Sequence, residues 1–359
     1  MSLHQFLVRA YRSFQHANRK FNSYLIAVQA ASMKSYYPEK KRKPFFRRWR
    51  ENRAWALKYG EVNRFYTLYG FDVCDGPDPS QYIDYLQFRN SREAANRVGK
   101  DDAQVVLLRD KLLFFQWMKH YRLPVPEVFA FLRGGKVFDL NFQEIPQEAL
   151  AGETDYFLKA QGGECASFVK HVRDYEQLCG VLSGLENGAY ILQRKVVQSA
   201  EMNKLNPGAI NTLRIVTINR DGNCRVLSSL LRVGTSGSGN VDNWAAGGLA
   251  IGIQPNGRLK EFGFYKPGFG TKDSVHPDTG VRFSDFTVPC YQEACDLALR
   301  AHKVFFNVRA IGWDIAITEA GPVFIEGNDN FEISLQQACD RPLREEWLIA
   351  ADDCVDHRS

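Results

Sequence analysis

Three oxygen-bearing side chains stand among apolar residues near the C-terminus, in the stretch GWDIAITEAGPVFIEGNDN at residues 312–330. The stretch predicts a β-hairpin, and side chains along a strand alternate between its two faces. On the return strand, Phe324, Glu326 and Asn328 are therefore expected on one face. A three-residue turn of Glu, Ala and Gly would bring Asp314 directly opposite Glu326, although a β-bulge would shift that register.

This register would place two carboxylates side by side, with an amide one strand step beyond them. Two neighbouring carboxylates repel each other, so one is pushed toward its protonated form unless a cation lies between them. An all-oxygen set suits Mg²⁺ or Mn²⁺ better than zinc, and Mg²⁺ usually completes its shell with water and phosphate oxygens. Asp314, Glu326 and Asn328 thus predict a metal site that works with a nucleotide. The alternative is an ordinary solvent-facing hairpin edge.

A phosphate-binding turn is the next feature that such a site requires. Lys159 lies on a predicted strand within residues 154–163 and is followed closely by Gly162 and Gly163. A glycine-rich turn can present successive backbone N–H groups to phosphate oxygens. Glycine turns also follow strands for purely structural reasons. The turn therefore indicates a phosphate site only together with the other candidate residues.

Two arginines lie on the arms of a predicted hairpin at residues 211–234, which turns at an Asp-Gly pair. Counting from the turn pairs position 214 with position 229, so Arg214 and Arg232 are not expected directly opposite each other. An arginine that alternates with apolar residues is either a solvated edge residue or an anion clamp.

Two loops add further polar candidates. Asn243 lies in a glycine-rich loop within residues 237–253, which is expected to lead into a strand. The motif HPDTG holds His276 and Asp278, which are interpreted either as contacts to a substrate or as members of a turn.

The composition is that of a globular chain with an uneven charge. Of its 359 residues, 45% are hydrophobic and 24% are charged, so the chain can bury one large core or two medium ones. Residues 1–60 carry fourteen Lys and Arg against two Asp and Glu, most densely in KKRKPFFRRWR at residues 40–50. This segment is either a solvated helical surface or a dock for an anionic partner such as a nucleotide-linked substrate, tRNA or a membrane face.

Cysteine usage and hydropathy predict a soluble, cytoplasmic protein. The eight cysteines show no C-x-x-C pair and no zinc-type spacing, which fits free thiols in a reducing compartment. No stretch approaches the roughly 18 apolar residues that a transmembrane helix needs.

Strands and helices follow each other without a regular βαβ rhythm, which predicts an α+β fold with prominent antiparallel pairing. Residues 103–109 are predicted as a short strand that leads into a helix from about Asp110. The other expected elements are helices at 1–65, 81–99 and 288–306, a hairpin at 127–140 that turns at Gly134-Gly135, and a strand at 190–197.

The order of these pieces resembles the ATP-grasp superfamily and, within it, the sugar-transfer associated ATP-grasp family. The resemblance covers most of the chain beyond residue 50, and its most specific parts are NTLRI, the VDN…GG loop and the last hairpin. The matching segments are EVNRFYTLYGFD (61–72), the DK of RDKLLFF (109–115), FLKAQGG (157–163), LQRKVVQ (192–198), NTLRIVT (211–217), LLRVG (230–234), VDNWAAGGL (241–249), HPDTG (276–280) and GWDIAIT…GPVFIEGN (312–328).

The resemblance implies an ATP-grasp fold, in which two α+β lobes clamp ATP after an N-terminal, mostly helical region. We expect the basic N-terminal region at 1–102, the small or lid lobe at 103–196, and the C-terminal lobe with the metal site at 197–359. The resemblance implies that Lys159, Gly162 and Gly163 contact the ATP phosphates, that Lys111 lies near the nucleotide, and that Gln193, Arg194, Lys195 and Val196 contact adenine chiefly through the backbone. It implies that Arg214 and Arg232 steady the γ-phosphate and the acyl phosphate, with Asn243 in the same catalytic set. It also implies that Asp314, Glu326 and Asn328 are the metal ligands. Many superfamily members have a proline after the strand lysine and a longer glycine run, whereas this chain has Ala160 and two glycines.

The same resemblance implies an ATP-dependent carboxylate–amine ligase, with ATP and Mg²⁺ as its cofactors. A carboxylate would attack the γ-phosphorus to give an acyl phosphate, and an amine would displace phosphate to form an amide or peptide bond. The branch name associates the substrate with sugar or polymer assembly. The alternatives are an ATP-grasp kinase that phosphorylates a hydroxyl and a nucleotide-gated binding protein that holds an anionic partner. The identity of both substrates and the oligomeric state, including a homodimer, stay open.

Overall fold

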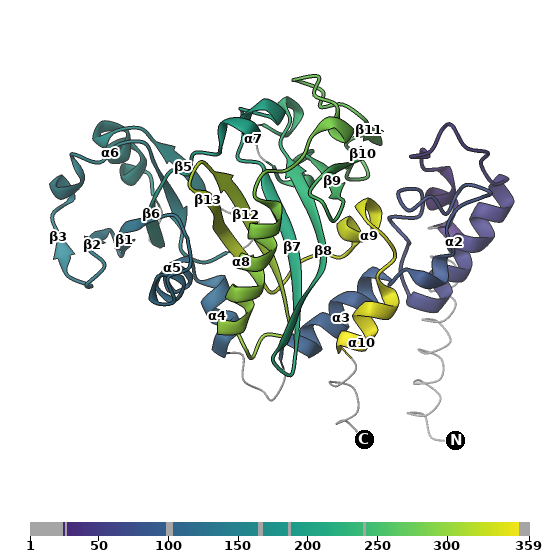
Figure 1. Ribbon diagram of the computed structural model, residues 1–359, viewed down its shortest axis with the longest axis horizontal. Coiled ribbons are helices and arrows are strands. Elements are labelled where there is room, and N and C mark those ends of the chain that lie inside the picture. The colour runs from purple at the N-terminus through teal and green to yellow at the C-terminus, as the bar shows by residue number, and fades with distance from the viewer. Residues whose placement is uncertain are drawn as a thin grey trace, which may run out of the picture.

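The computed structural model describes residues 24–25, 27–97, 103–163, 168–185, 188–239 and 242–351. Within these ranges the chain folds around two antiparallel sheets, one small and one large, with helices packed on both (Figure 1). The α+β fold predicted from the sequence is confirmed.

The small sheet has six strands in the order β3-β2-β1-β6-β4-β5, and every neighbouring pair is antiparallel. Its turn at Gly134-Gly135 is as predicted, and both glycines have the positive φ that favours this residue type. One apolar cluster joins the sheet to α6 around Leu178, and another joins it to α5 around Phe115. The elements are β1 (Val128–Arg133), β2 (Lys136–Phe138), β3 (Glu144–Ile145), β4 (Tyr156–Ala160), β5 (Val169–Val172), β6 (Ala189–Arg194), α5 (Lys111–His120) and α6 (Tyr175–Ser183).

The large sheet has seven strands in the order β11-β10-β9-β8-β7-β12-β13, again with antiparallel neighbours throughout. Both hairpins predicted near the C-terminus are present, as β7–β8 and β12–β13. The strands are β7 (Thr212–Arg220), β8 (Asn223–Val233), β9 (Leu249–Ile253), β10 (Leu259–Tyr265), β11 (Lys272–Asp273), β12 (Ala310–Thr318) and β13 (Gly321–Asn328).

One face of the large sheet carries the main hydrophobic core. α8 (Tyr291–Val304) lies across this face (Figure 1), and α4 (Ala103–Arg109) and α7 (Ala200–Leu205) also contribute to the core. Alternation along the strands sends Leu213 and Ile215 of β7, with Trp313 and Ile315 of β12, into it.

The opposite face of the sheet is divided between two apolar clusters and a polar area. Val216 and Ile218 pack on α3 (Tyr85–Asn96) and α10 (Arg344–Ala351). Leu230 and Ala250 pack on aromatic residues from the N-terminal region and on α9 (Ser334–Cys339). The strand positions between these clusters carry the polar side chains Thr212, Arg214, Arg232 and Asp314.

The N-terminal region is packed against the large sheet through aromatic side chains. Phe65, Tyr69 and Phe71 share a cluster with Trp244 and Phe264 of the sheet side. The backbone of Ile83 is paired with the side-chain amide of Gln337, at 2.9 Å for the N–H and 3.2 Å for the carbonyl. Buried contacts of this kind attach the region firmly to the sheet.

The helix expected over residues 1–65 is only partly present. Residues 1–23 and 26 lie outside the described residues, and the helical parts of the remainder are residues 24–25, residues 27–32 and α2 (Phe45–Tyr59). The prediction is wrong for residues 33–44 and 60–65. Gly60 ends α2 in a left-handed conformation, and Arg42 forms an isolated bridge with Val73.

The short strand expected at residues 103–109 is also wrong, because the segment is helix α4. Val105 and Leu108, three residues apart, are both buried in the main core. A spacing of three residues places two side chains on one side of a helix, and a short apolar run does not distinguish the two structures. The helices expected at 81–99 and 288–306 are present as α3 and α8.

Gly327→Ala is expected to lower the free energy of unfolding by about 1–3 kcal/mol through overpacking. A Cβ there would lie 2.8 Å from Leu108 Cδ2 and 2.9 Å from a ring carbon of Trp313, and both side chains are buried. The matched control is Gly180→Ala in α6, where a Cβ meets nothing within 4 Å. The control should raise stability by about 0.5–1 kcal/mol. Urea unfolding measures both, and an unchanged stability of Gly327→Ala would contradict the packing.

Candidate active site

Asp314 and Glu326 face each other across β12 and β13, as predicted. Two departures from the expected hairpin cancel each other. The turn has two residues, since Thr318 pairs with Gly321, and a bulge between Phe324 and Glu326 restores the register. The bulge also reverses the strand face, so the prediction that Phe324 shares a face with Glu326 and Asn328 is wrong. Phe324 is buried in the main core.

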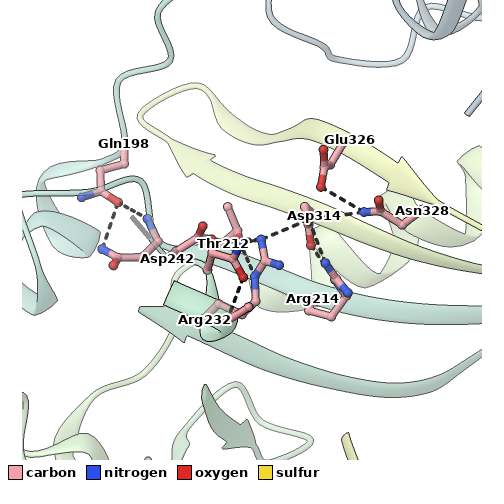
Figure 2. Close-up of polar contacts among 11 residues, drawn as sticks. Gln198, Thr212, Arg214, Arg232, Asp242, Asp314, Glu326 and Asn328 are labelled. Carbon is pink, nitrogen blue, oxygen red and sulfur yellow. Dashed lines mark hydrogen bonds and ion pairs between the residues drawn. The ribbon is translucent and has the colours of Figure 1, made fainter. Parts of the chain in front are cut away.

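Arg214 lies beside Asp314 on the neighbouring strand and holds its carboxylate with two hydrogen bonds. The Nε–Oδ1 distance is 2.6 Å and the Nη2–Oδ2 distance is 3.0 Å. Arg232 donates to the same Oδ2 from the other side, also at 3.0 Å (Figure 2). A bulge at Val216–Thr217 moves the β7–β8 register by one residue, so Arg214 pairs with Leu230 and not with position 229.

Arg232 is held by two further residues that the sequence analysis did not select. Its guanidinium donates to Thr212 Oγ1 at 3.0 and 3.2 Å and to Asp242 Oδ2 at 3.2 Å (Figure 2). Thr212 also donates to Asp242. Asp242 directly precedes the predicted Asn243, so the VDN motif was the available signal. Asn243 caps the 3₁₀ turn η5 (Trp244–Ala246), since its Oδ1 accepts from the Ala245 N–H at 2.9 Å.

Buried amides support the start of β7, next to Thr212. Gln198 Oε1 accepts from the backbone N–H of Asn211 at 3.0 Å and from its side chain at 3.1 Å. The Asn211 amide also donates to the Asn206 carbonyl at 2.9 Å. These hydrogen bonds fix the strand end that places Thr212 against Arg232.

Charge pairing determines the ionisation of Asp314. Burial alone would raise the pKa of this carboxyl, but Arg214 and Arg232 outweigh burial and lower the pKa to about 2. Burial alone would likewise lower the pKa of Arg232, whereas Asp242 and Asp314 raise it. Asp314 and Arg232 are therefore both charged at neutral pH.

Glu326 has the opposite behaviour. Burial and the neighbouring Asp314 carboxylate raise the pKa of Glu326. The Asn328 amide donates to Glu326 Oε1 at 3.1 Å and approaches Asp314 Oδ2 at 3.4 Å (Figure 2). The expected pressure toward protonation of one carboxylate is thus present, and a cation beside Glu326 would relieve it.

Two lysines from the small-sheet side interact electrostatically with Glu326. Burial lowers the pKa of Lys159 to about 8, against the opposing effect of the Glu326 carboxylate. Burial also lowers the pKa of Lys111, again opposed by Glu326. Lys159 Nζ donates to Gln193 Oε1 at 2.7 Å, and Lys111 Nζ lies 3.4 Å from the Gly163 carbonyl.

The two lysine-bearing elements are joined where α5 begins. The backbone N–H of Lys111 donates to the Gln161 carbonyl at 2.9 Å. The Gln161 side chain donates in turn to Asp110 Oδ2 at 2.7 Å. The start of α5 is thereby fixed to the end of β4, which carries Lys159.

The other residues expected near the nucleotide lie at the ends of β4 and β6. Gly162 and Gly163 are exposed, and residues 164–167 of the same loop lie outside the described residues. Arg194 pairs with Glu153 and stacks on Phe129 at 4.6 Å, and Lys195 Nζ lies 3.1 Å from Asp155. Val196 is half-buried on the segment that leads from the small sheet toward α7.

His276 and Asp278 act within a turn. His276 is fully buried; its Nε2 lies 2.9 Å from the Gly234 carbonyl, and its Nδ1 accepts from the backbone of Asp278 and Thr279 at 3.3 Å each. The Asp278 carboxylate accepts from the backbone and hydroxyl of Ser236. These contacts favour the turn-forming alternative over a substrate contact.

Internal carboxylates offset part of the charge in the basic segment at residues 40–50. Arg42 pairs with Asp72 at 2.9 Å, and Lys43 and Arg47 pair with Glu51 at 3.0 and 3.1 Å. Whether the remaining charge docks an anionic partner stays a prediction. All cysteines in the described ranges are free thiols, and no helix in those ranges is long and apolar enough to cross a bilayer.

A family model described as sugar-transfer associated ATP-grasp matches residues 159–349, which is more than half of the chain. The chain belongs to the sugar-transfer associated ATP-grasp family. The match includes the strand lysine, both arginines and the Asp314–Glu326 hairpin. No curated protein matches the sequence of this family member.

Solved structures similar to this ATP-grasp chain include three enzymes. N5-carboxyaminoimidazole ribonucleotide synthetase from Thermotoga maritima is 12% identical with a TM-score of 0.38, over 69% of this chain and 49% of that chain. The Thermus thermophilus enzyme of the same name is 14% identical with a TM-score of 0.42, over 68% and 52%. D-alanine-D-alanine ligase from Coxiella burnetii is 9% identical with a TM-score of 0.40, over 70% and 59%. The chain thus spans about half the length of these synthetases.

The predicted metal ligands fit a divalent cation that arrives with a polyanion. The described residues contain no cluster of three His, Cys, Asp or Glu side chains suited to a metal, and the predicted set has two carboxylates and an amide. Four cationic side chains (Arg214, Arg232, Lys111 and Lys159) interact with three carboxylates (Asp314, Glu326 and Asp242), so the formal sum is +1. This balance favours an anion with its own Mg²⁺ over a cation alone.

Asp314→Asn is expected to cost about 3–5 kcal/mol of unfolding free energy at pH 7, because it leaves the buried Arg214 and the half-buried Arg232 with one partner fewer. Since the pKa of Asp314 is lowered to about 2, its contribution is present above its unfolded pKa of about 3.9 and is lost as pH falls toward 2. The stability difference between the wild type and the variant should therefore shrink between about pH 4 and pH 2. Urea unfolding across this range measures it, and a constant difference would contradict the assignment.

Proposed function

We propose that this ATP-grasp protein is an ATP-dependent ligase that joins a carboxylate to an amine through an acyl-phosphate intermediate. The supporting observation is the convergence of the buried Asp314–Arg214–Arg232 cluster with Glu326 and two lysines from the small sheet. This arrangement supplies positioned charge, which is what phosphoryl and acyl transfer require of a protein. Membership of the family supports the ATP requirement.

ATP phosphates would be held mainly by cationic side chains. Lys159 and Lys111 would contact the phosphates from the small sheet, together with the exposed backbone at Gly162 and Gly163. The segment at 193–196 would meet adenine. Asp314, Glu326 and Asn328 would hold the Mg²⁺ that accompanies the nucleotide, and this ion would draw charge from the phosphate oxygens during transfer.

The arginines would act on the transferred group. Arg232 is bound at once to Thr212, Asp242 and Asp314, so its guanidinium position is fixed before any substrate arrives. A fixed cation can stabilise the negative charge that develops when the substrate carboxylate attacks the γ-phosphorus and ADP leaves. The amine would then attack the acyl carbon, and phosphate would leave. The protein needs no nucleophile of its own for these steps.

The arrangement of lobes is part of the proposal. The small lobe would span 103–196 and the C-terminal lobe 197–359, with the nucleotide between them. Approach of the two lobes would exclude water and so protect the acyl phosphate from hydrolysis. The N-terminal region at 1–102, whose described residues pack on the large sheet, would complete the C-terminal lobe.

Product analysis tests the reaction class. The purified chain with Mg-ATP is expected to release ADP only when a carboxylate and an amine are both present, from a panel of amino acids, uronic acids and amino sugars. Mass spectrometry should find a product lighter than its two substrates by one water.

Glu326→Gln should stay folded, because glutamine resembles the protonated acid, and should lose turnover. Glu345→Gln, an exposed change on α10, is the control. A product that has gained a phosphate would instead identify a kinase.

Arg232→Lys separates the clamp role from nucleotide binding. Lysine keeps the charge but cannot bridge Thr212, Asp242 and Asp314 in one geometry. The rate at saturating ATP is expected to fall about 100-fold or more, with the ATP KM changed less than about 3-fold. Steady-state kinetics with a circular-dichroism check of folding would measure this. A raised KM with an unchanged rate would show that Arg232 serves binding and not the chemical step.

A further inference from the structure

A small cavity lies between the N-terminal region and the large-sheet side, outside the candidate active site. Its volume is about 230 Å³, below the roughly 300–1,000 Å³ typical of sites for drug-sized ligands. Nearly half of its lining residues belong to the EVNRFYTLYGFD segment, to which the proposed reaction gives no role. The lining residues used below are Glu61, Asn63, Phe65, Asp84, Lys266 and Glu332.

The cavity offers acidic groups that lack ion-pair partners. Glu61 and Glu332 form no ion pair among the described residues. Asp84 differs, because its carboxylate already accepts from two backbone N–H groups at the start of α3 and from Trp55 Nε1 at 3.1 Å. Burial and the nearby Asp84 raise the pKa of Glu61, against the opposing effects of Arg64, which also lines the cavity, of the Leu86 backbone and of Arg89. A cationic ligand group would relieve the cost that remains.

The same cavity also offers donors without partners. Asn63 is 4% exposed, and its Nδ2 has no hydrogen-bond partner among the residues that the structure describes. The orientation of this amide is fixed, because its Oδ1 accepts from the Phe65 N–H at 3.1 Å. A buried N–H₂ group without a partner is costly and is relieved by an acceptor atom of a ligand. Lys266 forms no ion pair in the described ranges and lies over the Trp244 ring at 5.8 Å.

Aromatic side chains complete the wall. Trp55, Phe65, Tyr69 and Tyr85 line the cavity beside these charged groups. They would cover the apolar part of a ligand whose two charged ends are bound by opposite charges. Within the described part of the chain, two glutamates without ion pairs, two donors without partners and an aromatic wall together form the complement of a small molecule with an ammonium group, a carboxylate and an apolar part.

The wall of the cavity is connected to the candidate active site through the sheet register and a shared apolar cluster. Leu230 pairs directly with Arg214, and Ala250 pairs with Arg232. Both apolar residues belong to the aromatic cluster that contains Phe65 and Tyr69. Trp244 of that cluster follows Asp242, which binds Arg232. The wall of the cavity and the arginine clamp are therefore supported by the same loop and the same face of the sheet.

We propose that this cavity binds a small zwitterion of the free amino acid class, with its ammonium group at Glu61 and Glu332 and its carboxylate at Lys266 and the Asn63 amide. The binding itself does not require catalysis. Its assignment as a substrate subsite of the ligase rests on the proposed function.

Calorimetric titration of the full chain tests the site. The probes are L- and D-alanine, leucine and phenylalanine, each compared with its N-acetyl and its amide derivative, which lack one of the two charges. Saturable binding is expected for at least one zwitterion and at least about 10-fold weaker binding for both blocked forms. No saturable binding of any zwitterion up to about 10 mM would overturn the proposal, as would equal binding of the blocked forms.

Variants locate the binding in this cavity. Glu332→Gln is expected to weaken binding about 10- to 100-fold through loss of a charge-assisted contact. Lys266→Met tests the opposite end of the ligand and should give a similar loss of binding. It also serves as the test if Glu332→Gln is poorly folded. Glu261→Gln, an exposed change on β10, is the matched control and should leave binding unchanged. Thermal unfolding of each variant checks its fold. Unchanged binding in folded Glu332→Gln and Lys266→Met would overturn the location.

Titration of Mg-ATP and the ADP-release assay, run on the same samples, separate the two proposals. Amino acid binding that Glu332→Gln weakens, in a chain without ATP turnover, would leave the cavity assigned and the ligase reaction refuted. Turnover whose amino acid KM is the same in wild type and Glu332→Gln would support the ligase and refute the cavity as its subsite.

Discussion

The buried Asp314 carboxylate is the group around which the large sheet and its polar face are arranged. A charge in such a place is tolerated only when it is paired and hydrogen-bonded. Arg214 and Arg232 meet this requirement from two different strands. The order β8-β7-β12-β13 is what makes the three side chains neighbours. Thr212 and Asp242 then hold Arg232, and the buried amides of Gln198 and Asn211 hold the strand end that carries Thr212. The need to pair one buried carboxylate thus determines the position of the Asp242 loop, of the Gln198 segment and of the start of β7.

The two faces of the sheet follow from the same alternation of side chains. Residues of odd number in the middle of β7 and β12 enter the main core, and their even-numbered neighbours form the polar area or pack on the N-terminal region. The polar area remains available because two separate apolar clusters cover the rest of that face. An active site on this face therefore needs residues 24–97 as a wall, even though the chemistry is carried by residues far along the sequence.

The sequence was informative where contacts are local and uninformative where they depend on irregular backbone. Both C-terminal hairpins, the glycine turn at Gly134-Gly135 and the facing of Asp314 and Glu326 could be predicted from turn residues and alternation. The bulges could not, because no residue type in these strands marks them. One bulge reverses Phe324 into the core, and another shifts the partner of Arg214 by one position. Segment 103–109 was misassigned because seven residues contain too few turns to separate a helix from a strand.

Contacts between distant segments were beyond the sequence analysis. Asp242 and Thr212 gain their roles only because Arg232 reaches both, and a pattern along one strand does not reveal this. The N-terminal region was characterised from its charge, whereas its aromatic residues make the more extensive contacts with the sheet. The family resemblance predicted the order of the motifs along the chain. The structure shows which side chains of these motifs contact each other.

The joint between α5 and β4 has a mechanical consequence. The Asp110–Gln161 hydrogen bond and the backbone bond from Lys111 to Gln161 fasten the two lysine-bearing elements together, and Lys159 is tied in turn to Gln193. Lys111 and Lys159 are therefore held together by the joint between β4 and α5. Any displacement of that joint relative to Glu326 would move both lysines at once, so the electrostatic potential at Glu326 would change through two side chains together and not residue by residue.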